Sequence, residues 1–267
     1  MKIGFIGAGN MGGAILRGYL ATGNIKKEDI VVSEQSAEKL AELSASLGIT
    51  PAKDIPELVA LCDVIIVGVK PNAFETVLPI IAEKYTTDKI VVSMAAGIEI
   101  SFITKYLGTD AKIVRIMPNT PAMVNEAMVA VCRNENISNE AFEPIFNIFK
   151  TIGKAEEVPE SLIHCVIGVS GSSPAYTYMY IDALAEAAVK NGMNKEQAII
   201  FAAQSVLGAA KMVLETGVDP VQLRINVCSP GGTTIEAVTT LQQNGFEANI
   251  AEGFQAAVEK SKIMTKN

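Results

Sequence analysis

The sequence is poor in the residues that build metal centres and disulfide frameworks. It holds one histidine, His164, and four cysteines in 267 residues. The cysteines are scattered, without paired metal-ligand spacing, at Cys62, Cys132, Cys165 and Cys228. We therefore expect neither a zinc site nor a disulfide framework, and unpaired thiols fit a reducing cytoplasm. His164 lies in an apolar helical run, and we interpret it as a core or interface residue rather than a catalytic one.

Positive charge and long apolar runs are also scarce. Lysine and arginine number 22 against 29 acidic residues, the net charge is −7, and no basic cluster occurs. This balance argues against nucleic acid or an anionic membrane as the main partner. The longest apolar stretch, residues 162–189, is broken by Gly, Pro, Ser and Asp, so it does not predict a membrane span. The first residues enter a strand without a signal-peptide pattern, and we expect a cytoplasmic protein.

Apolar residues are abundant, at 49% of the chain, and can bury a sizeable core. Up to Pro159, strand-like runs alternate with helical ones, which predicts an α/β Rossmann domain with a doubly wound, mostly parallel sheet over residues 1–160. Strands are expected at Lys2–Gly7, Ile30–Ser33, Asp63–Val69, Lys89–Ser93 and Lys112–Ile116. Edge strands are expected at Met128–Cys132 and Ala155–Val158, with a helix over Asn139–Ile152 between them.

Past Pro159 the strand-like runs stop, and residues 161–267 predict an all-helical domain. Ser173, Asn194, Asp219, Thr233 and Glu247 begin or precede the expected helices, and glycines end several of them. The second helix carries small residues at Ala202, Ala203, Gly208, Ala209 and Ala210. Small residues allow close helix contact, either in a dimer interface or in a tight bundle within the chain.

A glycine motif follows the first strand directly: Gly7-Ala8-Gly9-Asn10-Met11-Gly12. Its glycines suit a tight turn, close approach of the backbone to a pyrophosphate, and helix-on-strand packing. The second strand ends in Ser33-Glu34-Gln35-Ser36, where such folds read the ribose. Glu34 can accept the ribose 2′-hydroxyl and favour NAD(H), or point away and leave its neighbours to bind a 2′-phosphate. A solvated turn is a third interpretation, and the sequence leaves the choice open.

The later strands end in small or polar loops, where open α/β sheets bind ligands. These loops are Gly68-Val69-Lys70-Pro71, Met94-Ala95-Ala96-Gly97 and Met117-Pro118-Asn119-Thr120-Pro121. Lys70 is placed to meet a cofactor, and the small residues let a ribose or nicotinamide approach.

A second loop, near the C-terminus, precedes a helix and reads Cys228-Ser229-Pro230-Gly231-Gly232-Thr233-Thr234-Ile235-Glu236. Thr233 and Glu236 have the spacing of a capping box, so a helix is expected to begin near Thr233. Free N–H groups at a helix start form an anion site that suits a small carboxylate. An ordinary loop with a capped helix is the alternative.

These motifs, in this order, resemble pyrroline-5-carboxylate reductase, the family that makes proline. The resemblance rests on Ile6–Met11, Val69–Pro71, Met117–Pro121, Gly168–Tyr176 and Val227–Ala237, and it spans essentially the whole chain. It implies reduction of 1-pyrroline-5-carboxylate to L-proline by NADPH or NADH. It also implies a helical dimerisation domain, often rings of dimers, and a substrate loop completed across the dimer interface. Ile225 departs from the family, which usually has an acidic residue there.

The resemblance carries site roles over to matching positions. Substrate contacts are expected at Glu160, Asn226, Ser229, Gly231, Gly232, Thr233 and Thr234. Cofactor contacts are expected at Ile6, Gly7, Ala8, Gly9, Asn10, Met11, Ser33, Glu34, Gly68, Val69, Lys70, Pro71, Met94, Ala95, Ala96 and Asn119. Thr234 is the expected catalytic residue, because its hydroxyl can hydrogen-bond the ring nitrogen of the imine.

Two other functions fit the sequence less well. A β-hydroxyacid dehydrogenase needs an acid or base, usually a lysine early in the first long helix of the second domain, yet the first lysine after Ser173 is Lys190. A non-catalytic dinucleotide-binding regulator would have no need of the Ser229–Glu236 loop.

Overall fold

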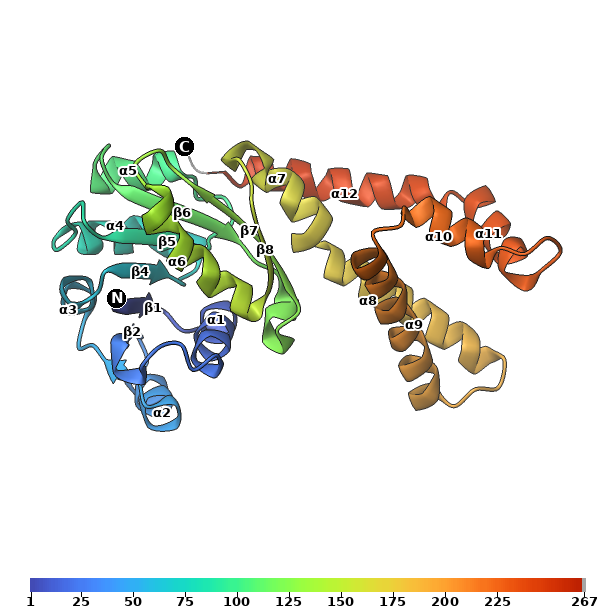
Figure 1. Cartoon of the computed structure of the whole chain (residues 1–267), viewed down its shortest axis with the longest axis horizontal. Helices are drawn as coiled ribbons and strands as arrows, with labels where there is room; N and C mark the ends of the chain where they lie inside the picture. Colours follow the sequence, from blue (N-terminus) through green and yellow to red (C-terminus); the bar gives the residue numbers. More distant parts are fainter. Residues whose placement is uncertain (266–267) are drawn as a thin grey trace. The chain divides into compact units, whose positions relative to one another are not determined.

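The computed structural model describes residues 1–265 (Figure 1). The chain divides into two compact units. The first comprises Met1–Gly171 together with the end of the chain from Ala257, and the second is Ser172–Ala256. The domain boundary expected at residue 160 stays a prediction, because compactness is one criterion for a domain and independent folding is another.

The first unit contains one eight-stranded sheet in the order β3-β2-β1-β4-β5-β6-β7-β8. Its strands are β1 (Ile3–Ile6), β2 (Ile30–Ser33), β3 (Thr50–Pro51), β4 (Val64–Val67), β5 (Ile90–Ser93), β6 (Lys112–Met117), β7 (Ala127–Arg133) and β8 (Gly153–Glu157). All neighbours pair in parallel except β6 and β7, which are antiparallel. The predicted doubly wound, mostly parallel sheet is confirmed.

Two details of the sheet differ from the sequence-based expectation. The two-residue strand β3 was not predicted, and a pair of residues is too short to give an alternating pattern. β7 was expected at an edge, but it lies between β6 and β8, so that expectation is wrong, whereas β8 lies at an edge as expected. Pairing with both neighbours explains the nearly continuous burial of β7.

Apolar runs in the central strands bury both faces of the sheet, as parallel sheets require. Ile3, Phe5 and Ile66 face one hydrophobic cluster, whereas Ile65 and Val91 face the other. Helices α1 (Asn10–Ala21), α2 (Ala37–Leu47) and α6 (Asn139–Phe149) contribute to the first cluster. Helices α3 (Ile55–Leu61), α4 (Phe74–Ala82), α5 (Ile100–Leu107) and α7 (Ile163–Val166) contribute to the second.

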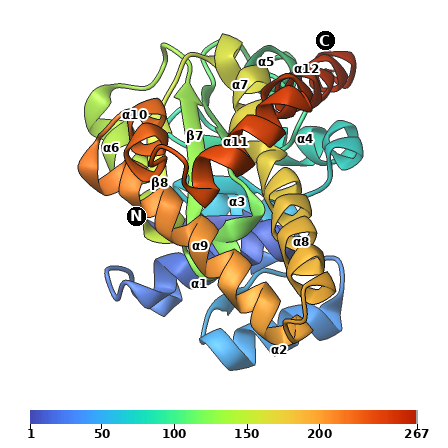
Figure 2. The same ribbon diagram turned by 90° about the vertical axis from the view of Figure 1, so that its right-hand side faces the viewer.

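The second unit is helical, as predicted. It contains α8 (Ser173–Lys190), α9 (Lys195–Thr216), α10 (Pro220–Val227), α11 (Thr233–Gln243) and most of the residues of α12 (Phe246–Ile263). Helices α8 and α9 pack side by side in both views (Figures 1 and 2). Expected caps are present: the Asn194 side chain accepts the N–H of Glu196, and the Asp219 side chain accepts that of Val221. The short helix α7 and the π-helical turn Ile167–Gly171 before α8 were not predicted.

The helices of the second unit leave much apolar surface uncovered within one chain. Large side chains on α8 and α9 are exposed, among them Met179, Ile200, Phe201 and Leu214. Within the described residues, α9 is the one helix long and apolar enough to span a membrane, but only 11% of its most apolar window is buried. Length and composition are weak grounds for a membrane span, and an apolar helix face also fits a protein partner.

Candidate functional site

The glycine loop after β1 is held by backbone contacts to two neighbouring strands. Gly7 has a φ of 83°, a conformation that favours glycine, and its N–H donates to the Ser33 carbonyl oxygen at 2.9 Å. The Gly68 N–H donates to the Ile6 carbonyl oxygen at 2.8 Å. A Cβ atom on Gly68 would lie 2.5 Å from the Gly7 carbonyl oxygen, so the ends of β1 and β4 meet only because both residues lack side chains.

The same loop is open on its outer side. Among the described residues, no heavy atom outside the neighbours of Gly9 lies within 4 Å of the position that its Cβ atom would take. Gly9 is the N-cap residue of α1 and makes no side-chain cap. The first N–H groups of α1 have no partner within the helix, and they lie at the positive end of its dipole. The loop therefore fits a pyrophosphate, which needs close backbone approach and N–H donors.

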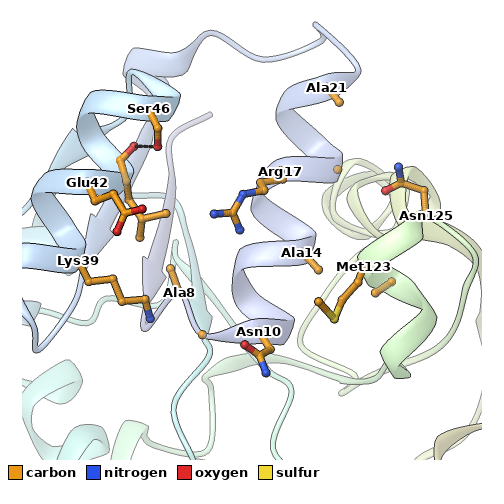
Figure 3. Close-up of a pocket in the computed structure, with 14 residues that line it drawn as sticks. Ala8, Asn10, Ala14, Arg17, Ala21, Lys39, Glu42, Ser46, Met123 and Asn125 are labelled. Carbon is orange, nitrogen blue, oxygen red and sulfur yellow. Dashed lines mark hydrogen bonds between the residues drawn. The ribbon is translucent and has the colours of Figure 1, made fainter.

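Two cavities lie beside the loop. One, of about 450 Å³, gathers predicted cofactor contacts from the ends of β1, β2 and β4: Ile6, Gly7, Gly9, Ser33, Glu34, Gly68, Val69 and Lys70. The other, of about 510 Å³, is lined by α1, α2 and residues near the turn Thr120–Val124, and it includes Ala8 and Asn10. In this second cavity Arg17 extends from α1 toward Glu42 on α2 (Figure 3). The strand order reverses between β1 and β4, where such sheets bind ligands.

Glu34 is fixed at the end of β2 by three donors. Its Oε2 accepts from the Ala8 N–H at 3.0 Å and from Lys39 Nζ at 3.0 Å, and its Oε1 accepts from the Gln35 N–H at 3.0 Å. Burial acts to raise the pKa of Glu34, but these bonds outweigh it, so the pKa lies below its ordinary value. Glu34 is therefore an ionised carboxylate at neutral pH, turned toward the glycine loop.

The residues predicted for the nicotinamide side follow β5 and β6. Met94, Ala95 and Ala96 come directly after β5, where the Ser93 hydroxyl accepts the Ala95 N–H at 3.3 Å. Asn119 follows β6 and is nearly buried, and both ends of its amide already have partners. Its Nδ2 donates to the Ser170 carbonyl oxygen and its Oδ1 accepts the Met128 N–H, each at 3.0 Å. The side-chain amide of Asn119 therefore links β7 to the π-helical turn Ile167–Gly171.

Six predicted cofactor contacts line neither cavity, namely Met11, Pro71, Met94, Ala95, Ala96 and Asn119. Met11 is in the first turn of α1 and packs against the core, and Pro71 begins the 3₁₀ turn Pro71–Ala73. Their assigned roles remain predictions.

Glu160 forms an ion pair with a buried arginine. Its Oε1 accepts from Arg115 Nη1 at 2.8 Å and from the Ile100 N–H, at the start of α5, at 2.9 Å. Arg115 is 1% exposed, and its Nε and Nη2 atoms have no hydrogen-bond partner within the described chain. Oε1 of Glu160, a predicted substrate contact, therefore already accepts two hydrogen bonds from within the protein. Glu160 also belongs to the first unit, whereas the other predicted substrate residues belong to the second.

The C-terminal loop places bare N–H groups at the start of α11. Gly231 has a φ of 68°, and the Gly232 N–H donates to the Ser229 carbonyl oxygen at 3.0 Å. The helix begins at Thr233, as predicted, but its N-cap is Gly232 without a side-chain hydrogen bond, so the predicted capping box is wrong. The glycine turn takes the cap position and shifts Thr233 into the helix. Thr233 and Thr234 are exposed in the first turn.

Other residues of α10 and α7 have clear surroundings. Asn226 is exposed, and its Oδ1 accepts from Gln222 Nε2 at 2.8 Å. Ile225 is 56% exposed. His164 is half-buried, with Nδ1 2.9 Å from the Ser261 hydroxyl, consistent with the structural role expected for it.

All four cysteines are free, and burial raises the pKa of Cys62 and of Cys132 to about 12, so neither is a ready nucleophile.

Sequence reasoning missed two charged residues at the site. Lys39 lies in the first turns of α2, close enough along the chain to reach back to Glu34. A lysine a few residues after the acidic residue expected at the ribose therefore indicates an ion pair. Arg115 interrupts the buried apolar run that follows Lys112 in β6, and a charge inside such a run indicates a partner without identifying it.

The glycine loop on a Rossmann sheet and the bare helix start on a helical unit define a class, namely dinucleotide-dependent oxidoreductases that act on small anionic substrates. Residues 2–97 match the family model described as NADP oxidoreductase, coenzyme F420-dependent. Residues 160–264 match the model described as pyrroline-5-carboxylate reductase dimerisation.

Full-length comparisons agree with these matches. The chain is 47% identical over 266 residues to pyrroline-5-carboxylate reductase of Escherichia coli, covering 100% of this chain and 99% of the relative. The solved structure of the Coxiella burnetii enzyme has a TM-score of 0.94 at 34% identity, covering 100% of this chain and 99% of that one. The Plasmodium falciparum enzyme, solved with NADP bound, has a TM-score of 0.89 at 32% identity, covering 100% and 98%. This chain belongs to the pyrroline-5-carboxylate reductase family, the NAD(P)H-dependent enzymes of the last step of proline biosynthesis.

The Arg115–Glu160 pair predicts a difference between two nearby glutamates. Glu160→Ala leaves Arg115 charged, buried and unpaired, and should lower the free energy of unfolding by about 3 kcal/mol. Glu157→Ala removes an exposed partner of Arg133 and should cost less than about 1 kcal/mol. Urea unfolding of the full chain at a fixed protein concentration measures both values. Equal effects would show that Arg115 does not depend on Glu160.

Proposed function

We propose that this chain reduces 1-pyrroline-5-carboxylate to L-proline with NADPH or NADH. The observation that carries the proposal is the presence, in one chain of this family, of a glycine loop open at Gly9 and of a second bare helix start at Thr233. The first supports a site for a dinucleotide and the second a site for a small carboxylate. When bound, the cofactor supplies the hydride.

In this proposal the protein orients its reactants and does little acid–base chemistry. A ring imine protonated on nitrogen is already electrophilic, so positioning its carbon against the nicotinamide is the main task. The N–H groups at the start of α11 hold the substrate carboxylate, with Ser229, Gly231 and Gly232 shaping the turn. The Thr234 hydroxyl hydrogen-bonds the ring nitrogen and donates or relays the proton that makes the imine electrophilic. Asn226 and Glu160 are further proposed contacts.

We also propose that the chain works as a homodimer formed through its helical unit, with a ring of dimers as the larger assembly. The exposed apolar side chains of α8 and α9 support this, because one chain leaves them uncovered. The matched dimerisation model covers the same helices. A partner chain rather than a lipid bilayer then covers α9, in keeping with a cytoplasmic enzyme.

The first test is consumption of NADH and of NADPH, in separate assays, by the purified chain with 1-pyrroline-5-carboxylate. Turnover that yields proline is expected with at least one cofactor. Cofactor binding without turnover of any imine would instead favour a non-catalytic regulator. Turnover of a small hydroxyacid alone would favour a hydroxyacid dehydrogenase.

Thr234 is tested by separating chemistry from binding. Thr234→Ala should lower kcat about 100-fold, a typical effect of losing a positioned proton donor, while the dissociation constant of the cofactor stays unchanged. Thr234→Ser should restore most of the turnover. Thr240→Ala, which alters an exposed threonine of the same helix, is the control and should behave as the parent. An unchanged kcat in Thr234→Ala would remove Thr234 from the chemistry.

The dimer is tested by sedimentation. The parent chain of 28.3 kDa should sediment as a dimer or larger species. Phe201→Glu places a charge on the exposed face of α9 and should shift the equilibrium strongly toward monomer. Leu61→Glu places the same charge on an exposed position of α3 and should leave the assembly intact. A monomeric parent at micromolar concentration would contradict the proposal.

A further inference from the structure

The inference concerns which nicotinamide cofactor this chain selects, and it rests on the proposed function. The relevant feature is the carboxylate of Glu34 at the end of β2. In Rossmann folds the residue at this place lies beside the ribose that carries either a 2′-hydroxyl or a 2′-phosphate. The two cofactors differ only there, so the surroundings of Glu34 decide between them.

The structure removes two of the three interpretations that the sequence leaves open. Glu34 does not point away from the site, because its Oε2 accepts the N–H of Ala8 in the glycine loop at 3.0 Å. Nor is it a solvated turn residue, because its side chain is 14% exposed and lines the 450 Å³ cavity together with Ser33 and Gly68. The carboxylate is held against the loop proposed to bind the pyrophosphate.

The hydrogen bonds of this carboxylate leave room for one kind of partner. An ionised carboxylate has about four acceptor positions and no donor. Oε2 already accepts from Ala8 and Lys39, and Oε1 accepts from Gln35, so the unused position lies on Oε1. A ribose 2′-hydroxyl can donate to it. A 2′-phosphate offers no such donor at neutral pH, and it brings like charge of about −1.5 to −2 against the carboxylate.

The neighbouring cations do not cancel this repulsion. Lys39 Nζ already pairs with Glu34 Oε2 at 3.0 Å, so contact with a phosphate would compete with that pair. Arg17 Nη1 is 3.5 Å from the Gly13 carbonyl oxygen, and Arg17 lines the other cavity. Lys70 lines the same cavity as Glu34, but it follows β4, which is separated from β2 by β1.

We propose that Glu34 makes this chain prefer NADH to NADPH, by accepting the ribose 2′-hydroxyl and repelling a 2′-phosphate, with Lys39 and Ala8 fixing the carboxylate in place. The preference belongs to these side chains and not to the fold, since the Plasmodium falciparum relative with the same fold was solved with NADP bound. Removing the carboxylate frees Lys39, which lines the same cavity as Ser33, to bind the phosphate.

The proposal is tested on the full-length protein with both cofactors as probes. Dissociation constants for NADH and NADPH come from fluorescence titration without substrate, and kcat/KM values come from assays with 1-pyrroline-5-carboxylate. The parent should favour NADH by at least about tenfold in both measurements, the size of effect that one misplaced polar group gives. Glu34→Gln keeps the size and removes the charge, and it should reduce that ratio about tenfold, chiefly through tighter NADPH binding.

Two further variants keep the test decisive. Glu34→Ser should shift the ratio of NADH to NADPH preference in the same direction. It replaces Glu34→Gln in the test if that variant does not fold. Glu42→Gln neutralises a carboxylate on α2, the helix that carries Lys39, and it should leave the ratio unchanged because Glu42 lines the other cavity.

The outcomes separate this inference from the proposed function. A parent that binds NADPH as tightly as NADH, or binds neither, overturns the inference. Variants at Glu34 that leave the ratio unchanged overturn it as well. If the cofactors bind but no imine is reduced, the proposed function fails while the ratio of dissociation constants still decides the role of Glu34.

Discussion

The backbone contact between Gly7 and Gly68 is the constraint on which the cofactor site depends. The Gly7 carbonyl oxygen would lie 2.5 Å from a Cβ atom on Gly68 and 2.8 Å from one on Gly12. Strand β1, strand β4 and helix α1 can therefore converge only where side chains are absent. This convergence places the start of α1 at the point where the strand order reverses, and it opens Gly9 toward a ligand. Glu34 then reaches the same loop from β2.

Two glutamates in the first unit show how burial changes the use of one chemical group. Glu34 pairs with a half-exposed lysine and keeps an acceptor position facing a cavity. Glu160 pairs with Arg115, whose burial makes the ion pair a structural necessity, because an unpaired charge in the core is costly. The carboxylate of Glu34 can therefore serve recognition directly, whereas the carboxylate of Glu160 also has to neutralise a buried arginine.

Local sequence signals predicted most of the fold and part of the site. Apolar runs ended by Gly68 or Ser33, and capping residues such as Asn194 and Asp219, act over a few residues, so strands and helix starts could be read directly. The interior place of β7, the partners of Asn119 and the Arg115–Glu160 pair depend on residues distant in sequence, which periodicity does not encode. The capping box at Thr233 failed because the preceding glycine turn took the cap position.

The central claim is that the chain moves a hydride from the nicotinamide to the carbon of a cyclic imine. The most direct test supplies NADH deuterated at both positions of nicotinamide C4, together with unlabelled 1-pyrroline-5-carboxylate, to the full-length protein. Mass spectrometry and NMR of the product should show proline with one deuterium on Cδ, the former imine carbon. Proline without deuterium, or no proline at all while the imine remains, would contradict the account.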